Sequence, residues 1–150
     1  MICYFGELPY QYGRFRHEPN PLNSNPFIAE FKNIVRDIYP NISFNSALIN
    51  YYPNAYSRLA LHSDDEEEIV NDSYILTISL GQTRRLVFAT RQQPSTPICN
   101  VVVEHRSLII FSKASQHCFR HGVLPYNDGQ DDKSKNIGRV SITLRLLASD

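Results

Sequence analysis

The sequence predicts a mainly β fold, a barrel or jelly-roll sandwich, preceded by a single N-terminal helix. Three observations predict it. The 150 residues suffice for one domain with a real hydrophobic core but not for two. Helical periodicity occurs once, and the texture then changes to short strand-sized runs joined by turn-rich segments. We therefore expect one domain over residues 1–150, with an arm over 1–25, a helix over 26–39 and a β core over 44–147.

The arm is rich in Tyr, Pro, Asn and Gly, which predicts irregular structure. The helix is expected to begin after Asn25, a favoured capping residue, because Pro26 suits the first helical position and Pro40 ends the run. One apolar helical face is expected to cover a sheet, and it comprises Phe27, Phe31, Ile34, Val35 and Ile38.

The β core contains short runs rich in β-branched and aromatic residues, typical of strands. Gly81 and Gln82 stand where a hairpin turn is expected, whereas residues 91–97 and 126–136 are polar loops. The expected strands are 47–52, 74–80, 86–89, 98–103, 107–111 and 139–147.

Composition restricts the partners and the compartment. Apolar and charged contents of 42% and 20% are ordinary for a soluble protein, and no apolar run is long enough to cross a membrane. A net charge of zero disfavours duplex nucleic acid more than a short single strand. Three widely spaced cysteines argue against a disulfide framework, so we expect an intracellular, reducing location, cytoplasmic or nuclear. We also expect a monomer.

His62 and Asp64 follow a short extended segment. Residues two apart in a strand point to the same side, so both side chains can face one metal ion. The alternative is a solvated loop, because an acidic run continues to Glu68. Two imidazoles and one carboxylate form the facial triad of non-haem Fe(II) oxygenases, which leaves coordination positions for a co-substrate and O2.

His121 is the candidate third ligand. His117, four residues earlier, competes with it, and a zinc cluster of His117, Cys118 and His121 is conceivable but lacks a second ligand pair. His105 is expected to be a surface or turn residue.

Arg139 and Arg145 are six residues apart on the last expected strand, so they point to the same face, together with Ser141 and Thr143. The intervening residues are apolar. Buried cations require anions, and a guanidinium matches the far carboxylate of 2-oxoglutarate. The alternative places this polar face in solvent.

Five segments together resemble the AlkB family of Fe(II)/2-oxoglutarate dioxygenases, particularly its animal nuclear members and the short domains in plant-virus polyproteins. They are residues 44–52 (FNSALINYY), 62–66 (HSDDE), 78–88 (ISLGQTRRLVF), 121–123 (HGV) and 139–145 (RVSITLR). The sequence around Tyr4 and Tyr10 resembles that family's N-terminal substrate arm.

The resemblance implies a double-stranded β-helix (jelly-roll, cupin-like) with iron held by His62, Asp64 and His121. It favours His121 over His117. The cofactors implied are Fe(II), 2-oxoglutarate and O2. It implies that Arg139, with Tyr52 and Ser141, binds the C5 carboxylate of 2-oxoglutarate. Asn50 and Arg145 would serve the C1 end, and Tyr10, Tyr12, Asp65 and Glu66 would contact the base.

The implied reaction is oxidative demethylation of N-alkylated bases, such as 1-methyladenine or 3-methylcytosine, in single-stranded RNA or DNA. Two departures bear on this. Ser141 stands where many relatives have Asn, and the loop after His121 carries Asp128, Asp131 and Asp132 where duplex-binding relatives are basic. The alternatives are a hydroxylase of a protein or small molecule, and a non-catalytic nucleic-acid-binding domain.

Overall fold

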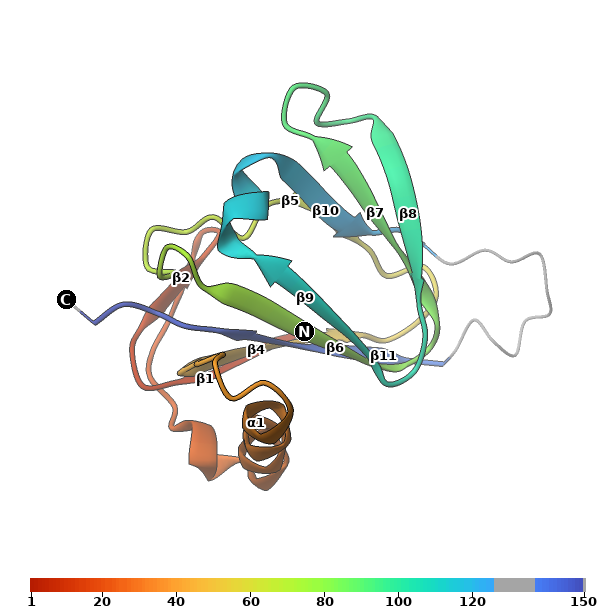
Figure 1. Cartoon of the computed structure of the whole chain (residues 1–150). Coiled ribbons are helices and arrows are strands. Elements are labelled where there is room, and N and C mark those ends of the chain that lie inside the picture. The colour runs from red at the N-terminus through yellow and green to blue at the C-terminus, as the bar shows by residue number, and fades with distance from the viewer. Residues whose placement is uncertain (126–136, 150) are drawn as a thin grey trace.

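A computed structural model describes residues 1–125 and 137–149 and shows two antiparallel sheets packed face to face, with a helix on the outer side of one of them (Figure 1). The fold is a jelly-roll. The polar loop expected over residues 126–136 lies outside the described residues.

The larger sheet has five strands in the order β1-β4-β11-β6-β9. Its central strand β11 pairs with β4 on one side and β6 on the other, so Ser141 lies opposite both Asn50 and Ser79. The strands are β1 (Ile2–Gly6), β4 (Ser46–Tyr52), β11 (Arg139–Arg145), β6 (Tyr74–Gly81) and β9 (Ser107–Ser112).

The smaller sheet has four strands in the order β5-β10-β7-β8, and a separate two-stranded hairpin joins β2 and β3. The 3-10 helix η2 (Lys113–His117) leads from β9 of the larger sheet into β10 of the smaller one. The strands are β5 (Leu59–His62), β10 (Phe119–Val123), β7 (Arg84–Thr90), β8 (Pro97–Val103), β2 (Tyr10–Tyr12) and β3 (Phe15–His17).

All six expected strands are confirmed, but the irregular arm over residues 1–25 is wrong. That segment forms β1, the β2–β3 hairpin and the 3-10 helix η1 (Leu22–Ser24). Strand β1 pairs along its whole length with β4 and buries Tyr4 and Phe5. The aromatic residues that suggested an irregular arm are themselves favoured in strands.

The hairpin expected at Gly81 is also wrong. The turn joins β6 of the larger sheet to β7 of the smaller one, so it crosses between sheets. Gly81 has a φ of 92°, and a Cβ there would lie 2.3 Å from the carbonyl oxygen of Gly138. Only glycine fits this close backbone approach.

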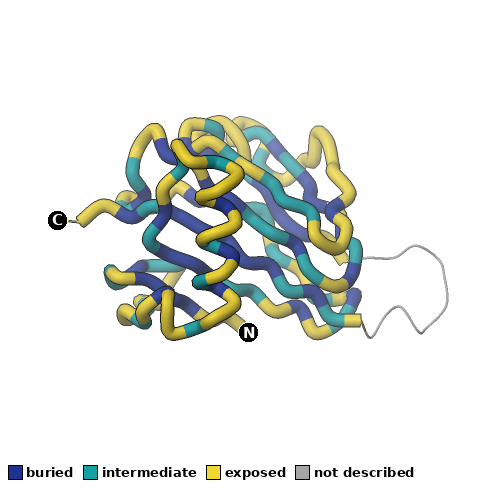
Figure 2. Tube along the Cα trace, turned by 60° about the horizontal axis from the view of Figure 1, so that its bottom comes forward, coloured by how far each residue is buried: buried dark blue, intermediate teal, exposed yellow. Residues whose placement is uncertain are grey.

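Helix α1 (Pro26–Ile38) begins as expected, since the Asn25 side chain accepts hydrogen bonds from the backbone N–H groups of Phe27 and Ile28. Its buried stripe is narrower than expected. Ile28, Phe31 and Val35 are buried, whereas Phe27, Ile34 and Ile38 are at least 47% exposed. Figure 2 looks onto this side, where the helix lies across the strands of the larger sheet.

The main apolar core lies between α1 and the larger sheet. Ile142 and Leu144 of β11 pack there with Phe31 and Val35 of the helix. The alternate residues of β11 point to the other side, into the space between the two sheets, and they form the candidate site.

Candidate metal centre and anion pocket

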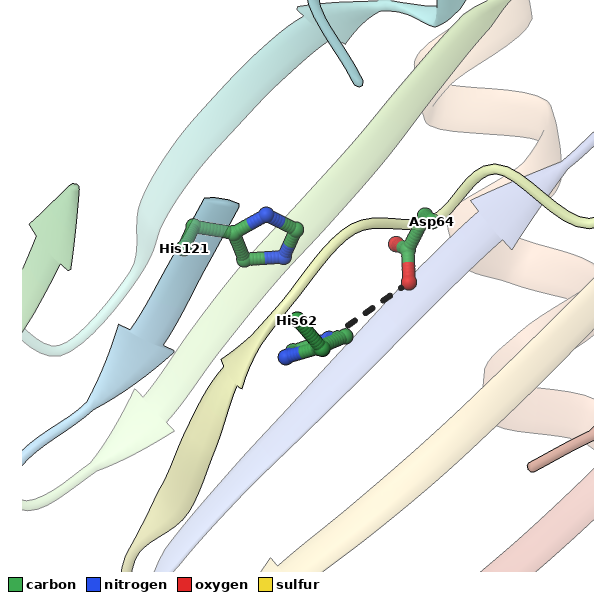
Figure 3. Close-up of side chains that lie close together, drawn as sticks. All are labelled: His62, Asp64 and His121. Atoms are coloured by element: carbon green, nitrogen blue, oxygen red, sulfur yellow. Dashed lines mark ion pairs between the residues drawn. The ribbon is translucent and has the colours of Figure 1, made fainter. Parts of the chain in front are cut away.

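Three potential metal ligands meet at the edge of the smaller sheet. His62 ends β5, Asp64 lies two residues later, and His121 on β10 is directly opposite His62 in the strand register. One ligand atom from each residue lies within 4.8 Å of the others (Figure 3). His117 is exposed on η2 and is not part of this group.

A contact with the backbone selects the tautomer of the neutral His62 imidazole. Its Nδ1–H donates a hydrogen bond to the carbonyl oxygen of Ala60 at 2.9 Å, which leaves the Nε2 lone pair free. Nε2 lies 3.5 Å from Oδ1 of Asp64. Burial lowers the pKa of His62, but the facing carboxylate outweighs it and raises the pKa overall. A lone pair and a carboxylate oxygen that face each other are suited to share a cation.

Asp64 is a buried carboxylate that remains ionised. Burial favours its neutral form, but the ion pair with Arg145 (Nη2 to Oδ2, 2.8 Å) holds the pKa well below its usual range. Within the described residues, Oδ1 accepts no hydrogen bond. Burial also lowers the pKa of His121 to about 4, so this imidazole is neutral near pH 7 and can ligate a metal. The residues present therefore fit a divalent metal.

A cavity adjoins these ligands between the two sheets. Its volume is about 40 Å³. Its floor is the inward face of β11, where Arg139 and Arg145 are both at most 3% exposed. The polar or ionisable residues that line it are Tyr12, Asn50, Tyr52, His62, Asp64, Thr77, His121, Arg139, Ser141, Thr143 and Arg145.

Arg139 is the cation in this cavity that can accept an anion. Its Nε donates to the Ser79 hydroxyl at 2.9 Å, and its guanidinium lies 4.9 Å from the centre of the Tyr52 ring. Its Nη1 is buried and makes no hydrogen bond within the described part of the chain. A buried unpaired N–H of a cation is costly, and a carboxylate in the cavity would satisfy it.

The sequence profile of the 2OG-Fe(II) oxygenase superfamily matches residues 4–145. The chain belongs to this superfamily. Oxygenases of this class use Fe(II), 2-oxoglutarate and O2, and the cavity offers a donor set of the right chemistry for both the metal and a carboxylate.

Several similar curated proteins are AlkB homologues, which confirms the resemblance noted in the sequence. Alpha-ketoglutarate-dependent dioxygenase alkB homolog 3 from Bos taurus is 32% identical over the whole chain, and its human counterpart is 28% identical. The RNA-directed RNA polymerase of Lolium latent virus is also 28% identical over the whole chain, which covers 8% of that protein. The chain spans about half the length, 52%, of the two homologues named first.

The fold comparison agrees. The structure of OsALKBH1 has a TM-score of 0.63 and 18% sequence identity, over 97% of this chain and 77% of that one. This likeness supports the jelly-roll architecture. Among the described residues, no helix has both the length and the apolar character needed to cross a membrane.

The remaining site residues expected of this oxygenase fall into two groups. Asn50, Tyr52, Ser141 and Tyr12 line the cavity. Arg145 lies there too, but its guanidinium is already ion-paired with Asp64, so it contacts one of the potential metal ligands directly.

The expected base contacts are less favourable. Tyr10 is 1% exposed and packs between Tyr4 and Tyr12, so its ring face is not open to a base. Asp65 is exposed and ion-paired with Arg91, outside the cavity. Glu66 is half-buried, and burial raises its pKa. Of the four expected base contacts, Tyr12 is the aromatic residue that lines the cavity.

Several residues that shape the site were missed. Thr77 and Ser79 alternate with apolar residues along β6, the same signal that identified the inward face of β11. Thr77 bonds Thr143 at 3.1 Å, and Ser79 orients Arg139. This alternation could have identified both.

Asp64 is also held through its backbone by two buried residues of η2. The Lys113 ammonium donates to the carbonyl oxygens of Asp64 at 3.5 Å and Glu66 at 2.9 Å. The Gln116 side-chain oxygen accepts the Asp64 N–H at 3.2 Å. The 3-10 helix therefore fixes the position of the carboxylate, and no sequence signal indicated this.

Proposed function

We propose that the chain is an Fe(II)- and 2-oxoglutarate-dependent dioxygenase that demethylates N-alkylated bases, such as 1-methyladenine and 3-methylcytosine, in single-stranded RNA or DNA. One observation carries the proposal. A single cavity contains both the His62, Asp64 and His121 group and the buried, incompletely bonded guanidinium of Arg139. The AlkB homologues among its relatives support the choice of substrate class.

The metal ligands in this proposal are His62, Asp64 and His121. Arg139 binds the C5 carboxylate of 2-oxoglutarate, with Tyr52 and Ser141 beside it. Asn50 lies opposite Ser141 in the register and serves the other end of the co-substrate. Arg145 keeps Asp64 ionised and correctly oriented. When bound, the metal, 2-oxoglutarate and O2 supply the oxidation, which yields succinate, CO2 and a hydroxylated N-methyl group that leaves as formaldehyde.

The protein's contribution is to position the base and exclude water. The base lies between the rings of Tyr12 and His62, both of which line the cavity. Alkylated bases pair poorly, so their removal from a stack costs less. Glu66 is close enough to Tyr10 to raise the pKa of that tyrosine, it makes no ion pair with any described residue, and it suits the positive charge of 1-methyladenine. Asp65, paired with Arg91, is the weaker candidate for this role.

The test is the mass of a single strand with one 1-methyladenine after incubation with protein, Fe(II), 2-oxoglutarate and ascorbate. Ribose and deoxyribose versions are compared, because a viral RNA polymerase is among the relatives. We expect loss of a methyl mass with an equal amount of succinate. His62→Ala should abolish both products, whereas the exposed His117→Ala, a matched control, should retain them. Succinate without demethylation would indicate another substrate, such as a protein or small molecule. The absence of both products would indicate a non-catalytic binding domain.

A further inference from the structure

A second hollow lies beside the metal group, next to β5 and β10 of the smaller sheet. It is lined by His62, Ser63, Asp65, Arg91, Pro94 and Arg120. Along β5 and the residues after it, His62 and Asp64 point inward, so Ser63 and Asp65 point outward. Arg120 likewise alternates with the inward-pointing His121 on β10. His62 lines both this hollow and the metal cavity, so the two are neighbours.

Arg120 carries the available positive charge of this hollow. The residue is half-buried, yet its guanidinium makes no hydrogen bond or ion pair to any described residue. Arg91 differs from it. Its Nη2 is ion-paired with Asp65 and its Nε donates to the Gln116 carbonyl oxygen at 3.0 Å.

The pair of Arg91 and Asp65 is neutral, so the hollow has a net charge of about +1, which comes from Arg120. Arg91 is held by Asp65 and by the Gln116 carbonyl oxygen, so its side chain forms one side of the hollow. The carboxylate of Asp65 also lies in the hollow, but Arg91 compensates it. A half-buried guanidinium with free N–H groups on a polar concave surface is suited to bind an oxyanion.

We infer that this hollow binds a phosphodiester group of the strand whose methylated base enters the metal cavity, with Arg120 as the main contact. The inference rests on the proposed function. A base that stacks along His62 leaves the sugar and phosphate at the rim of the cavity, where His62 borders the hollow. The chain as a whole has no net charge, so local cations of this kind must attract the phosphate backbone.

The first measurement is the affinity of the Fe(II)- and 2-oxoglutarate-loaded protein for a short, fluorescently labelled single strand, by anisotropy without oxygen. Four proteins are compared over a series of salt concentrations: wild type, Arg120→Gln, Arg120→Lys and Arg85→Gln. Arg85 is an exposed arginine at the far end of β7 and is the matched control, since its loss removes the same charge elsewhere.

Arg120→Gln should weaken binding about fivefold at low salt. It should also reduce the slope of log affinity against log salt by about 0.7, the value for one lost contact to a single strand. Arg120→Lys should restore most of the slope, and Arg85→Gln should match wild type. Equal effects of Arg120→Gln and Arg85→Gln, or no effect of either, would overturn the inference.

The second measurement identifies the phosphate. Single neutral methylphosphonate linkages are moved along the strand, one position at a time. In wild type, one linkage near the methylated base should weaken binding most, and this penalty should disappear in Arg120→Gln. Penalties that are the same in both proteins at every linkage would contradict the inference.

The two proposals fail differently. Demethylation without an Arg120 effect would refute only the phosphate site. Strand binding with the Arg120 effect but without demethylation would refute only the proposed reaction. A wild-type protein that does not bind the strand at all would refute both proposals.

Discussion

The two faces of the larger sheet differ in what they bury. On the side of α1, Ile142 and Leu144 of β11 contact an apolar core. On the opposite side the same strand presents Arg139, Thr143 and Arg145, which are all buried and line the cavity between the sheets. Alternate residues of one strand therefore serve separate purposes: one face stabilises the fold, and the other holds charges that ligands can use.

The energetics of the two faces are opposite in sign. Each fully buried apolar side chain stabilises the folded state by roughly 1.5–3 kcal/mol. Buried cations destabilise it unless they find partners, and Nη1 of Arg139 and Nε of Arg145 make no hydrogen bond to any described residue. Substitutions on the helix face should reduce stability and leave ligand binding unchanged. Most substitutions on the face between the sheets should reduce ligand binding and change stability little.

The largest expected effect breaks this division. Asp64→Ala removes a metal ligand and also leaves the buried guanidinium of Arg145 without its anion. We expect metal affinity to fall at least about 100-fold, and the free energy of unfolding to fall by about 3 kcal/mol. Calorimetric titration with Mn(II) and urea unfolding measure the two. His62→Ala is the comparison, since it removes a proposed ligand but leaves the ion pair of Asp64 and Arg145 intact. Tight Mn(II) binding by Asp64→Ala would refute the ligand assignment.

On the helix face, Phe31→Ala should lower the free energy of unfolding by about 3 kcal/mol, because it leaves a cavity between α1 and the sheet. Phe27→Ala, on the same helix but 50% exposed, should cost less than about 1 kcal/mol. Urea unfolding gives both values. Mn(II) affinity should be the same in both variants, and a marked loss in Phe31→Ala would show that the two faces are coupled.

Inside the sandwich, Arg139→Met should raise the concentration of 2-oxoglutarate required for half-maximal succinate formation by about tenfold or more, the loss of a charge-assisted hydrogen bond. Stability should be unchanged or higher, because a buried cation with an unpaired N–H is removed. Ser79→Ala, which removes only the bond that orients Arg139, should have a smaller effect. An unchanged requirement for 2-oxoglutarate in Arg139→Met would exclude its proposed role.

Lys113→Met tests the support of the metal site from η2. The variant keeps the stem of the side chain but loses the bonds to the carbonyl oxygens of Asp64 and Glu66. Mn(II) affinity should decrease about tenfold, as for the loss of other groups that orient a ligand. Lys32→Met, on α1, is the matched control and should bind as wild type does. Equal affinities in the two variants would mean that Asp64 is held without the ammonium group.

Alternation in the sequence predicted much of this arrangement. It identified β11 as a strand with Arg139 and Arg145 on one face, and it left open whether that face was inside. The pairing of β10 with β5 places His121 directly opposite His62, whereas His117 lies on η2 outside this group of potential ligands. Strand register depends on contacts between distant segments, which periodicity alone does not specify.

Other features depended on tertiary contacts that the sequence does not encode locally. The sequence around Gly81 is typical of a hairpin turn, but this turn passes close to Gly138 and connects the two sheets. Tyr10 has the aromatic character expected of a base contact, but it is buried beneath Tyr12. Arg120 belongs to no local motif, and the inferred phosphate contact rests on its place in the neighbouring hollow.

The smallest expected effect concerns Thr77 and Thr143, whose hydroxyl groups bond each other at 3.1 Å inside the sandwich. Thr77→Val alone should destabilise the protein by about 1 kcal/mol, because the partner hydroxyl loses its bond. The double variant Thr77→Val/Thr143→Val should recover most of this loss, since both polar groups are replaced together. Urea unfolding of the two single variants and the double variant measures the coupling. Additive losses would show that these hydroxyls support the fold separately, whereas recovery would show that what stabilises the sheet is their mutual bond and not either hydroxyl by itself.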